Sequence, residues 1–305
     1  MRNAFIKKLN QIAAGDKNLY LMTGDLGYAV LDDFRKTFPG QFINAGIAEQ
    51  NMTSVAAGIA LEGKVVFTYS IANFPILRCL EQIRNDCAYH NANVKIISIG
   101  GGFSYGPLGM THHATEDLAI MRALPDVAVF APGDPAEAAA MTDAMYAHKG
   151  TCYMRLGKGG EKQIHKENEK INPGKACVFS RGTRVNILSA GGMLEEAVKT
   201  AEILNNQGIS TGVVSFPRIK PIDVDTIREL ASSCELLVTA EEHNVIGGLG
   251  GAVAEILSEK KYKAVLLRAG IQDTYSSVVG SQQYLRDYYG LSDLKIAEKV
   301  MKNVY

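Results

Sequence analysis

The stretch 46-GIAEQNMTSVAAGIALEG-63 follows the apolar segment 41-QFINAG-46 and opens a helix, and this step begins the pattern that sets the fold. Apolar residues recur at the spacing of one buried helix face, at Met52, Val55, Ala56, Ile59 and Ala60. Glu49 stands in the first turn and projects onto that same face. It is either an acid that the helix dipole favours at this end or a functional carboxyl. If a partner covers the face, the carboxyl loses water and can hold or exchange a proton near neutral pH.

The same alternation of apolar runs and helices continues along the chain. Near-continuous β-branched and apolar runs, typical of buried parallel strands, occupy 18–24, 64–70, 94–100, 127–132, 151–156, 184–191, 211–216, 235–242 and 263–270. Helical patterns occupy 1–15, 77–91, 135–150 and 193–208. This order predicts an α/β protein of doubly wound layers with mostly parallel sheets.

One segment interrupts the alternation and predicts a domain boundary. The stretch 157-GKGGEKQIHKENEKINPGK-175 is rich in glycine, then densely charged, and then contains Pro173-Gly174. A chain of 305 residues is long enough for two domains. We therefore expect a first domain over residues 1–172 and a second over residues 173–305.

Composition excludes several classes of protein. Lys+Arg 32 balances Asp+Glu 32, which argues against nucleic-acid or membrane-surface binding through bulk charge and weakly favours an oligomer. No run approaches ~18 apolar residues, so a soluble cytoplasmic protein is expected. The cysteines show no CxxC pair and no zinc-binding spacing, which predicts reduced, mostly buried residues at 79, 87, 152, 177 and 234.

The loop 99-IGGGFSYGPLGMTHHATEDLA-119 follows a strand and delivers Thr111-His112-His113 before a helix. Loops at the carboxyl ends of strands bind ligands in open α/β sheets. The adjacent histidines lack the spacing of a metal site, and the glycines match neither common phosphate-loop pattern. An active-site loop with a polar histidine is the favoured interpretation.

Two further strand ends carry candidate site residues. The stretch 69-YSIANFP-75 places aromatic residues that either close a core or stack on a flat heterocycle. Arg155 ends an apolar strand before glycines, where it either binds a phosphate or carboxylate or forms an inter-domain ion pair.

Together these segments resemble the transketolase family of thiamine diphosphate enzymes, over nearly the whole chain. The resemblance rests on 46-GIAEQNM-52, 69-YSIANF-74, 109-GMTHHATEDLAIMRALPDVAVFAPGD-134 and Arg155, with 193-MLEEAVKTAEILNNQGISTGVVSFPRIKPID-223 and 239-TAEEHNVIGGLG-250 in the second half. It implies a pyrimidine-binding domain followed by a transketolase C-terminal domain.

The resemblance implies cofactor roles for residues at the strand ends. Glu49 would hydrogen-bond the aminopyrimidine of thiamine diphosphate and stabilise the tautomer that deprotonates the thiazolium carbon. Phe74, with Tyr69, would stack on the pyrimidine, because the family's second aromatic is replaced here by Ile71. Asp25 would reach the cofactor from the first strand, and Arg78 is a further candidate at this wall.

The resemblance also implies contacts to the substrate. His112 would face the substrate hydroxyl and the cofactor amino group, and Arg155 would hold a sugar phosphate. The family's transketolases carry an aspartate where this chain has Leu108, and a phosphate-contacting histidine near Gly100, which is missing here. We therefore expect an altered ketose or acceptor.

A partner polypeptide is implied as well. The family holds the diphosphate and Mg²⁺ through a Gly-Asp-Gly motif followed by Asn, and 133-GDP-135 does not fit that pattern. The chain thus resembles the C-terminal subunit of a split transketolase. Its N-terminal subunit would supply the diphosphate and magnesium ligands, and two copies of each chain would assemble around a two-fold axis.

Other functions stay open from the sequence. A deoxyxylulose phosphate synthase-like enzyme or a 2-oxoacid dehydrogenase β-subunit would share the domains and the glutamate. A non-catalytic scaffold that kept the fold is the alternative from outside enzymology. Glu241-Glu242-His243, before a glycine-rich turn, is expected to order a loop or an interface rather than to catalyse.

Overall fold

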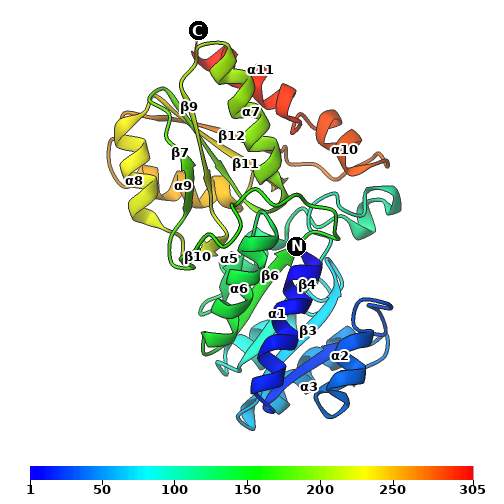
Figure 1. Cartoon of the computed structure of the whole chain (residues 1–305). Helices are drawn as coiled ribbons and strands as arrows, with labels where there is room; N and C mark the ends of the chain where they lie inside the picture. Colours follow the sequence, from blue (N-terminus) through cyan, green and yellow to red (C-terminus); the bar gives the residue numbers. More distant parts are fainter. Residues whose placement is uncertain (305) are drawn as a thin grey trace.

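The chain folds into two α/β domains, stacked one above the other in a computed structural model that describes residues 1–304 (Figure 1). The strands of the first sheet are β1 (Leu19–Thr23), β2 (Phe42–Asn44), β3 (Val65–Ile71), β4 (Val94–Ile99), β5 (Ala128–Phe130), β6 (Cys152–Leu156) and β10 (Arg218–Lys220). They lie in the order β10-β5-β6-β4-β3-β1-β2, and all except β10 run parallel to their neighbours.

The second sheet is smaller and also mostly parallel. Its strands are β7 (Cys177–Ser180), β8 (Val185–Ser189), β9 (Thr211–Ser215), β11 (Leu236–Asn244) and β12 (Val265–Ile271), in the order β12-β11-β8-β9-β7. Only the edge strand β7 pairs antiparallel within this sheet. The prediction of two doubly wound, mostly parallel α/β layers is confirmed.

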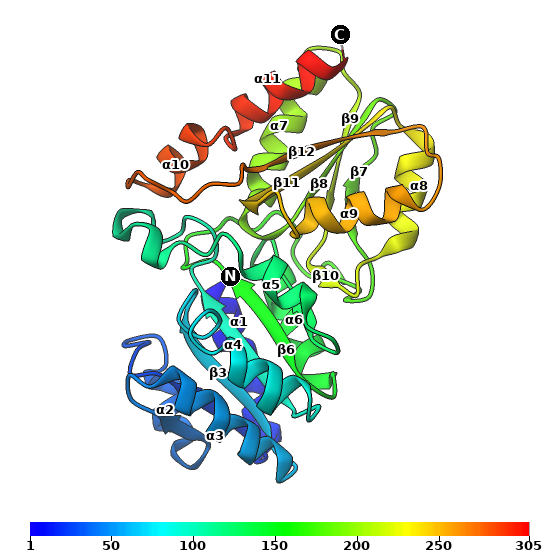
Figure 2. The same ribbon diagram turned by 180° about the vertical axis from the view of Figure 1, so that it is seen from behind.

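Helices cover both faces of the sheets. They are α1 (Arg2–Gly15), α2 (Asp32–Thr37), α3 (Glu49–Leu61), α4 (Leu80–Gln82), α5 (Asp117–Ala123), α6 (Pro135–Ala147), α7 (Leu194–Asn206), α8 (Val224–Ser233), α9 (Leu249–Ser258), α10 (Gln282–Tyr288) and α11 (Asp293–Val304). Helix α1 lies in front of the first sheet in Figure 1 and behind it in Figure 2. The helices α1 and α6 share one core with the sheet, and α3 and α5 belong to a second core on its other face.

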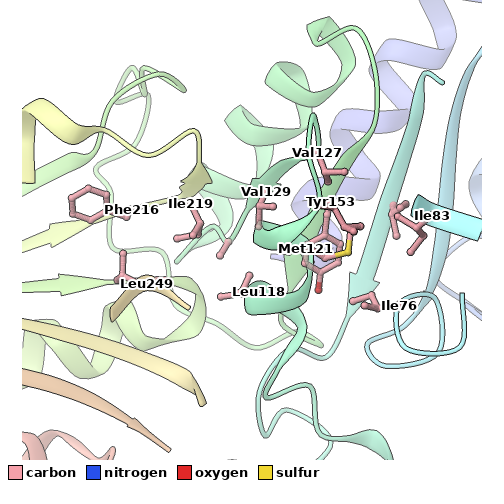
Figure 3. Packing of buried hydrophobic residues seen from close by; sticks show 14 of the residues in the cluster. Ile76, Ile83, Leu118, Met121, Val127, Val129, Tyr153, Phe216, Ile219 and Leu249 are labelled. Carbon is pink, nitrogen blue, oxygen red and sulfur yellow. The ribbon is translucent and has the colours of Figure 1, made fainter. Parts of the chain in front are cut away.

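One apolar core joins the two domains. Leu118 and Met121 of α5 lie between Ile83 on the first-domain side and Phe216 and Leu249 on the second-domain side (Figure 3). Strand β10, which follows β9 in the sequence, adds an antiparallel edge to the first sheet beside β5. The first sheet is therefore completed by a segment from the second half of the chain.

Two local predictions are corrected by the structure. Val55 is 41% exposed, so its assignment to the buried face of α3 is wrong; that face consists of Glu49, Met52, Thr53, Ala56, Ala57 and Ala60. The helix expected over 77–91 is shorter than predicted, because residues up to 79 form turns and Ile83–Ala88 is a π-helical segment. The edge strands β2, β7 and β10, of three or four residues each, were too short to show a pattern.

The predicted crossover contains no helix or strand over residues 157–176. It runs from the end of β6 to the start of β7 and so links the two sheets. No helix among residues 1–304 is both long and apolar enough to cross a membrane.

Candidate active site

Glu49 is the first residue of α3, and its side chain is almost completely buried. The end of β1 lies against it: a Cβ added at Gly24 would be 3.5 Å from the Glu49 Cγ. The side chain makes one hydrogen bond to another described residue, in which Arg78 Nη1 donates to Oε2 over 2.7 Å. The oxygen Oε1 is therefore left for a further partner.

Arg78 connects Glu49 to the aromatic rings of Phe74 and His112. Its guanidinium carbon lies 4.7 Å from the centre of the Phe74 ring, and the side chain of Arg78 is 45% exposed. The Phe74 ring is half-buried and meets the His112 ring edge-on, with 5.3 Å between centroids. Glu49, Arg78, Phe74 and His112 thus form one continuous row of contacts.

His112 lies on a 3-10 turn, Met110–His112, that the 72–77 turn holds in place. Asn73 donates its side-chain amide to the His113 carbonyl and, over 3.5 Å, to the Thr111 carbonyl. Thr111 Oγ1 and His112 Nδ1 lie 3.0 Å apart, and Nε2 of His112 makes no hydrogen bond to any residue of 1–304. Sequence analysis gave Asn73 no role, because its hydrogen-bond partners lie about 40 residues further along the chain and come close only in the fold.

The second histidine of the pair has a structural role. His113 is buried, and its Nε2 donates to the Gly106 carbonyl over 3.1 Å. Burial lowers the pKa of His113, so the ring is neutral at physiological pH. Only His112 is available to a ligand.

Asp25 follows β1 with a left-handed backbone, φ 56°. Its N–H donates to Asn44 Oδ1 over 3.0 Å, and its carboxylate accepts from Asn44 Nδ2 over 2.9 Å. Tyr28 donates a second hydrogen bond to the same carboxylate over 3.2 Å. These contacts fix the loop that adjoins Gly24 and Glu49.

Tyr69 does not join the aromatic rings of Phe74 and His112. Its ring is buried and stacks on Phe5 of α1, with 6.5 Å between centroids. Burial raises the pKa of its hydroxyl well above the usual value. The structure therefore contradicts the prediction that Tyr69 stacks on a cofactor, and Ile71, half-buried at the end of β3, supplies no ring in its place.

Gly100 is buried beneath an aromatic side chain. Its φ is +92°, and a Cβ there would lie 2.1 Å from the Tyr105 ring. Tyr105 in turn lies 6.4 Å from the His112 ring between centroids. Leu108 is exposed on the turn between them. Tyr105, which the sequence did not single out, fills the space at position 100.

Arg155 lies apart from this row, at the contact between the domains. Its Nη1 donates to Asp117 Oδ1 over 3.0 Å, and its Nη2 donates to the carbonyl of Glu242 in the second domain over 2.5 Å. It also lines an interdomain pocket of about 140 Å³ together with Gly101, Gly192 and Arg286. The ion pair of Arg155 thus lies within the first domain, and its bond to the second domain is to a backbone carbonyl rather than the expected inter-domain ion pair. Binding of a sugar phosphate stays a prediction.

Glu241, Glu242 and His243 order loops, as expected; His243 Nε2 accepts the Ala119 N–H over 3.3 Å. Glu241 accepts the N–H groups of Leu249 and Gly250 at the start of α9, 2.7 Å each. Glu242 accepts the Phe103 N–H over 2.8 Å and binds Arg286.

Comparison with known proteins now identifies the class. The family described as the transketolase pyrimidine-binding domain matches residues 1–160, and the transketolase C-terminal domain matches residues 174–296. The chain belongs to the transketolase family.

Relatives extend over the length of the chain. A putative transketolase C-terminal section of Methanocaldococcus jannaschii is 37% identical over 100% of this chain and 96% of its own. An apulose-4-phosphate transketolase subunit of Phocaeicola vulgatus is 34% identical over 99% and 97%. The 6-deoxy-6-sulfo-D-fructose transketolase subunit of a Clostridium species is 36% identical over 97% and 92%.

Solved structures agree. A split gene transketolase, described as an inactive beta4 tetramer, superposes with a TM-score of 0.91 at 37% identity and covers 99% of this chain and 97% of that one. Transketolase of Campylobacter jejuni, at 19% identity, shares the fold with a TM-score of 0.82, and the match covers 46% of that longer chain. This chain is similar throughout to subunits of split transketolases.

Proposed function

We propose that this chain is the C-terminal subunit of a split transketolase that uses thiamine diphosphate to transfer a two-carbon ketol unit from a ketose to an aldose. One observation carries the proposal: the buried Glu49 carboxyl, whose Oε1 is not used by Arg78, is connected through Arg78 to the Phe74 ring and from there to His112. A carboxyl linked through one arginine to a half-buried aromatic ring fits a flat aminopyrimidine.

Each residue of the row would have a distinct task. Glu49 Oε1 would share a proton with a ring nitrogen of the aminopyrimidine, Phe74 would stack on the ring, and His112 would hold a proton at the substrate hydroxyl. Thiamine diphosphate, when bound, supplies the nucleophilic carbon that carries the two-carbon unit. Asp25 would fix the loop beside Glu49.

An exposed apolar rim supports the need for a partner. Ile47, Leu77, Leu108 and Met110 are exposed and lie two to four residues from Glu49, Phe74 or His112 in the sequence. Exposed large apolar side chains next to polar site residues are typical of a surface that another chain covers. We propose that an N-terminal subunit covers it, supplies the ligands for diphosphate and Mg²⁺, and assembles with this chain as two of each.

The experiment is reconstitution. We expect that the chain mixed with its N-terminal subunit retains thiamine diphosphate and Mg²⁺ and transfers a ketol unit, whereas either chain alone does neither. Turnover by this chain alone would contradict the proposal. Pyruvate decarboxylation without ketol transfer would instead favour a deoxyxylulose phosphate synthase-like or 2-oxoacid dehydrogenase-like activity.

For the substrate we propose a ketose other than xylulose 5-phosphate. Leu108 stands where the family's transketolases carry a hydroxyl-reading aspartate, and Tyr105 fills the space at Gly100. Two relatives are named for apulose 4-phosphate and 6-deoxy-6-sulfofructose, which makes these the first donors to assay. Full activity on xylulose 5-phosphate and ribose 5-phosphate would contradict this part.

A further inference from the structure

Three potential ligand side chains meet at the junction of the domains, away from the row formed by Glu49, Arg78, Phe74 and His112, which we call the Glu49 row. Glu137 lies in the first turn of α6, His165 in the crossover, and Cys177 at the start of β7. A carboxylate oxygen of Glu137, a ring nitrogen of His165 and the Cys177 Sγ all lie within 4.8 Å of one another. We call these three residues the junction cluster.

His165 is oriented toward the other two by a carboxylate. Its Nδ1 donates to Asp134 Oδ2 over 3.0 Å, and Asp134 also accepts the backbone N–H groups of Ile164 and His165 over 2.9 Å each. The free Nε2 faces Glu137 Oε1 at 3.8 Å. A carboxylate on the remote ring nitrogen is the usual support of a metal-binding histidine, because it fixes the tautomer and orientation of the ring.

Glu137 offers an oxygen without a partner. Its Oε2 accepts the Gly133 N–H over 2.6 Å and the Ser215 hydroxyl over 3.0 Å. Its Oε1 is buried and accepts no hydrogen bond from any described residue. An orphaned carboxylate oxygen in a fully buried side chain is unfavourable unless a cation or proton occupies the space beside it.

Cys177 gives the cluster access to solvent. It is half-buried, and it lines an open pocket of about 210 Å³ together with His165, Val178 and Phe179. The Phe179 ring packs edge-on to His165 with 4.7 Å between centroids. An ion can therefore enter from this side, and a water molecule can complete its coordination.

We propose that Glu137, His165 and Cys177 bind one divalent transition-metal ion of the Zn²⁺ type, with a fourth coordination position open to the pocket. One oxygen, one nitrogen and one sulfur ligand suit Zn²⁺ or Co²⁺, whereas Mg²⁺ and Ca²⁺ prefer oxygen ligands only. A tetrahedral Zn²⁺ site places its oxygen and nitrogen ligands about 3.3 Å apart. The side chains of Glu137 and His165 need only a small movement to reach it.

The bound ion would clamp the two domains. Its ligands come from α6 of the first domain, the crossover, and the edge strand of the second sheet. Metal that binds only the folded chain stabilises it by mass action. The site would therefore fix the position of the second domain without touching the reaction.

The test uses the full chain alone, metal-free, with a reductant that is not a thiol. Titration with Co²⁺ should give a thiolate-to-cobalt charge-transfer absorption that saturates at one equivalent. Zn²⁺ should displace it, and excess Mg²⁺ should not. Zn²⁺ should also raise the melting temperature.

Matched variants assign the ligands. Cys177→Ala should abolish the charge-transfer absorption, weaken Zn²⁺ binding at least ~10-fold and remove the thermal shift, whereas Cys234→Ala, which removes a thiol outside the cluster, should change none of these. Asp134→Asn keeps the helix cap of α6 and should weaken binding by about 10–100-fold with the absorption retained.

Circular dichroism of each variant shows whether it is folded. If folded wild-type chain gives no charge-transfer absorption with stoichiometric Co²⁺, the site does not exist. Equal Zn²⁺ affinity of folded wild type and folded Cys177→Ala would overturn the assignment as well.

Discussion

The Glu49 row and the junction cluster each place a buried carboxylate beside a basic side chain, yet they differ in what surrounds the pair. The partner of Glu49 is a half-exposed arginine on an open rim, whereas Glu137 faces the buried His165. Exposed surroundings allow another molecule or chain to bind beside Glu49. The buried oxygen of Glu137 and ring nitrogen of His165 are suited to binding an ion. We therefore propose different roles for the same side-chain chemistry, according to its burial.

The largest effect should separate the two regions outright. Glu49→Gln removes the acid that shares a proton with the cofactor, and we expect kcat of the reconstituted pair to fall about 10²–10⁴-fold. Co²⁺ binding at the junction cluster should not change. Cys177→Ala should do the reverse, with cobalt binding lost and turnover kept. A Glu49→Gln enzyme with wild-type kcat would remove the basis of the comparison.

The pH dependence of stability should come from the junction cluster. Burial raises the pKa of Glu137 to about 7, so the folded chain binds this proton more tightly than the unfolded chain does. The free energy of unfolding of the metal-free chain should therefore fall by about 3 kcal/mol as pH rises from about 4.5 to about 7. Denaturant unfolding across this range measures the change.

The ionisable groups that face Glu137 titrate mostly outside this pH range, so the effect of Glu137 can be isolated. Burial alone would raise the pKa of Asp134, but hydrogen bonds from His165 and from backbone N–H groups lower it to about 2, below the window. Burial raises the pKa of the Cys177 thiol above the window. Burial tends to lower the pKa of His165, but Asp134 raises it overall, so it adds a fall at higher pH. Glu137→Gln should flatten the lower part of the curve, and the exposed Glu167→Gln should not.

A moderate effect should distinguish the two aromatic residues that the sequence grouped together. Phe74→Ala removes the ring proposed to stack on the pyrimidine, and we expect thiamine diphosphate affinity of the reconstituted pair to weaken by about 1–2 kcal/mol, or roughly 5–30-fold. Tyr69→Phe keeps the ring that packs on Phe5 and should leave this affinity unchanged. If Tyr69→Phe weakened thiamine diphosphate affinity as much as Phe74→Ala does, Tyr69 would belong to the cofactor site after all.

The smallest effect should be that of breaking the Arg78–Glu49 ion pair on the stability of the chain. Arg78 is nearly half exposed, so solvent screens its interaction with Glu49. Arg78→Met should change the free energy of unfolding of the chain by under about 1 kcal/mol. Urea unfolding of the two proteins at the same salt concentration measures it, and a loss of several kcal/mol would show that this pair is as enclosed as the junction cluster.

Prediction from the sequence succeeded where the signal was contiguous. Nine apolar runs became strands, because a buried parallel strand must be apolar along its length. Glu49, Phe74 and His112 could be proposed from the sequence because each stands at the end of a strand or the start of a helix within a short motif, and their roles stay predictions. The π-helical turn at Ile83–Ala88 and the exposure of Val55 were missed, since helical periodicity does not say which side faces the sheet.

The junction cluster shows where such reasoning stops. The cysteines were dismissed because they lack zinc-type spacing in the sequence, yet Cys177 lies near His165 and Glu137 in the fold. The partners of Arg78 and Asn73 could not be predicted either, because the turn before the π-helical segment brings these side chains to residues that are distant in the sequence.

The sequence by itself determined the α/β class, the family and the acid at the start of α3, because local periodicity and short motifs are encoded by neighbouring residues. Only the tertiary structure decided that Tyr69 is buried in the core, that Arg155 bonds across the domain contact, and that three distant ligand atoms meet. The physical reason is that burial and partner choice depend on side chains that the fold brings together from separate strands and helices.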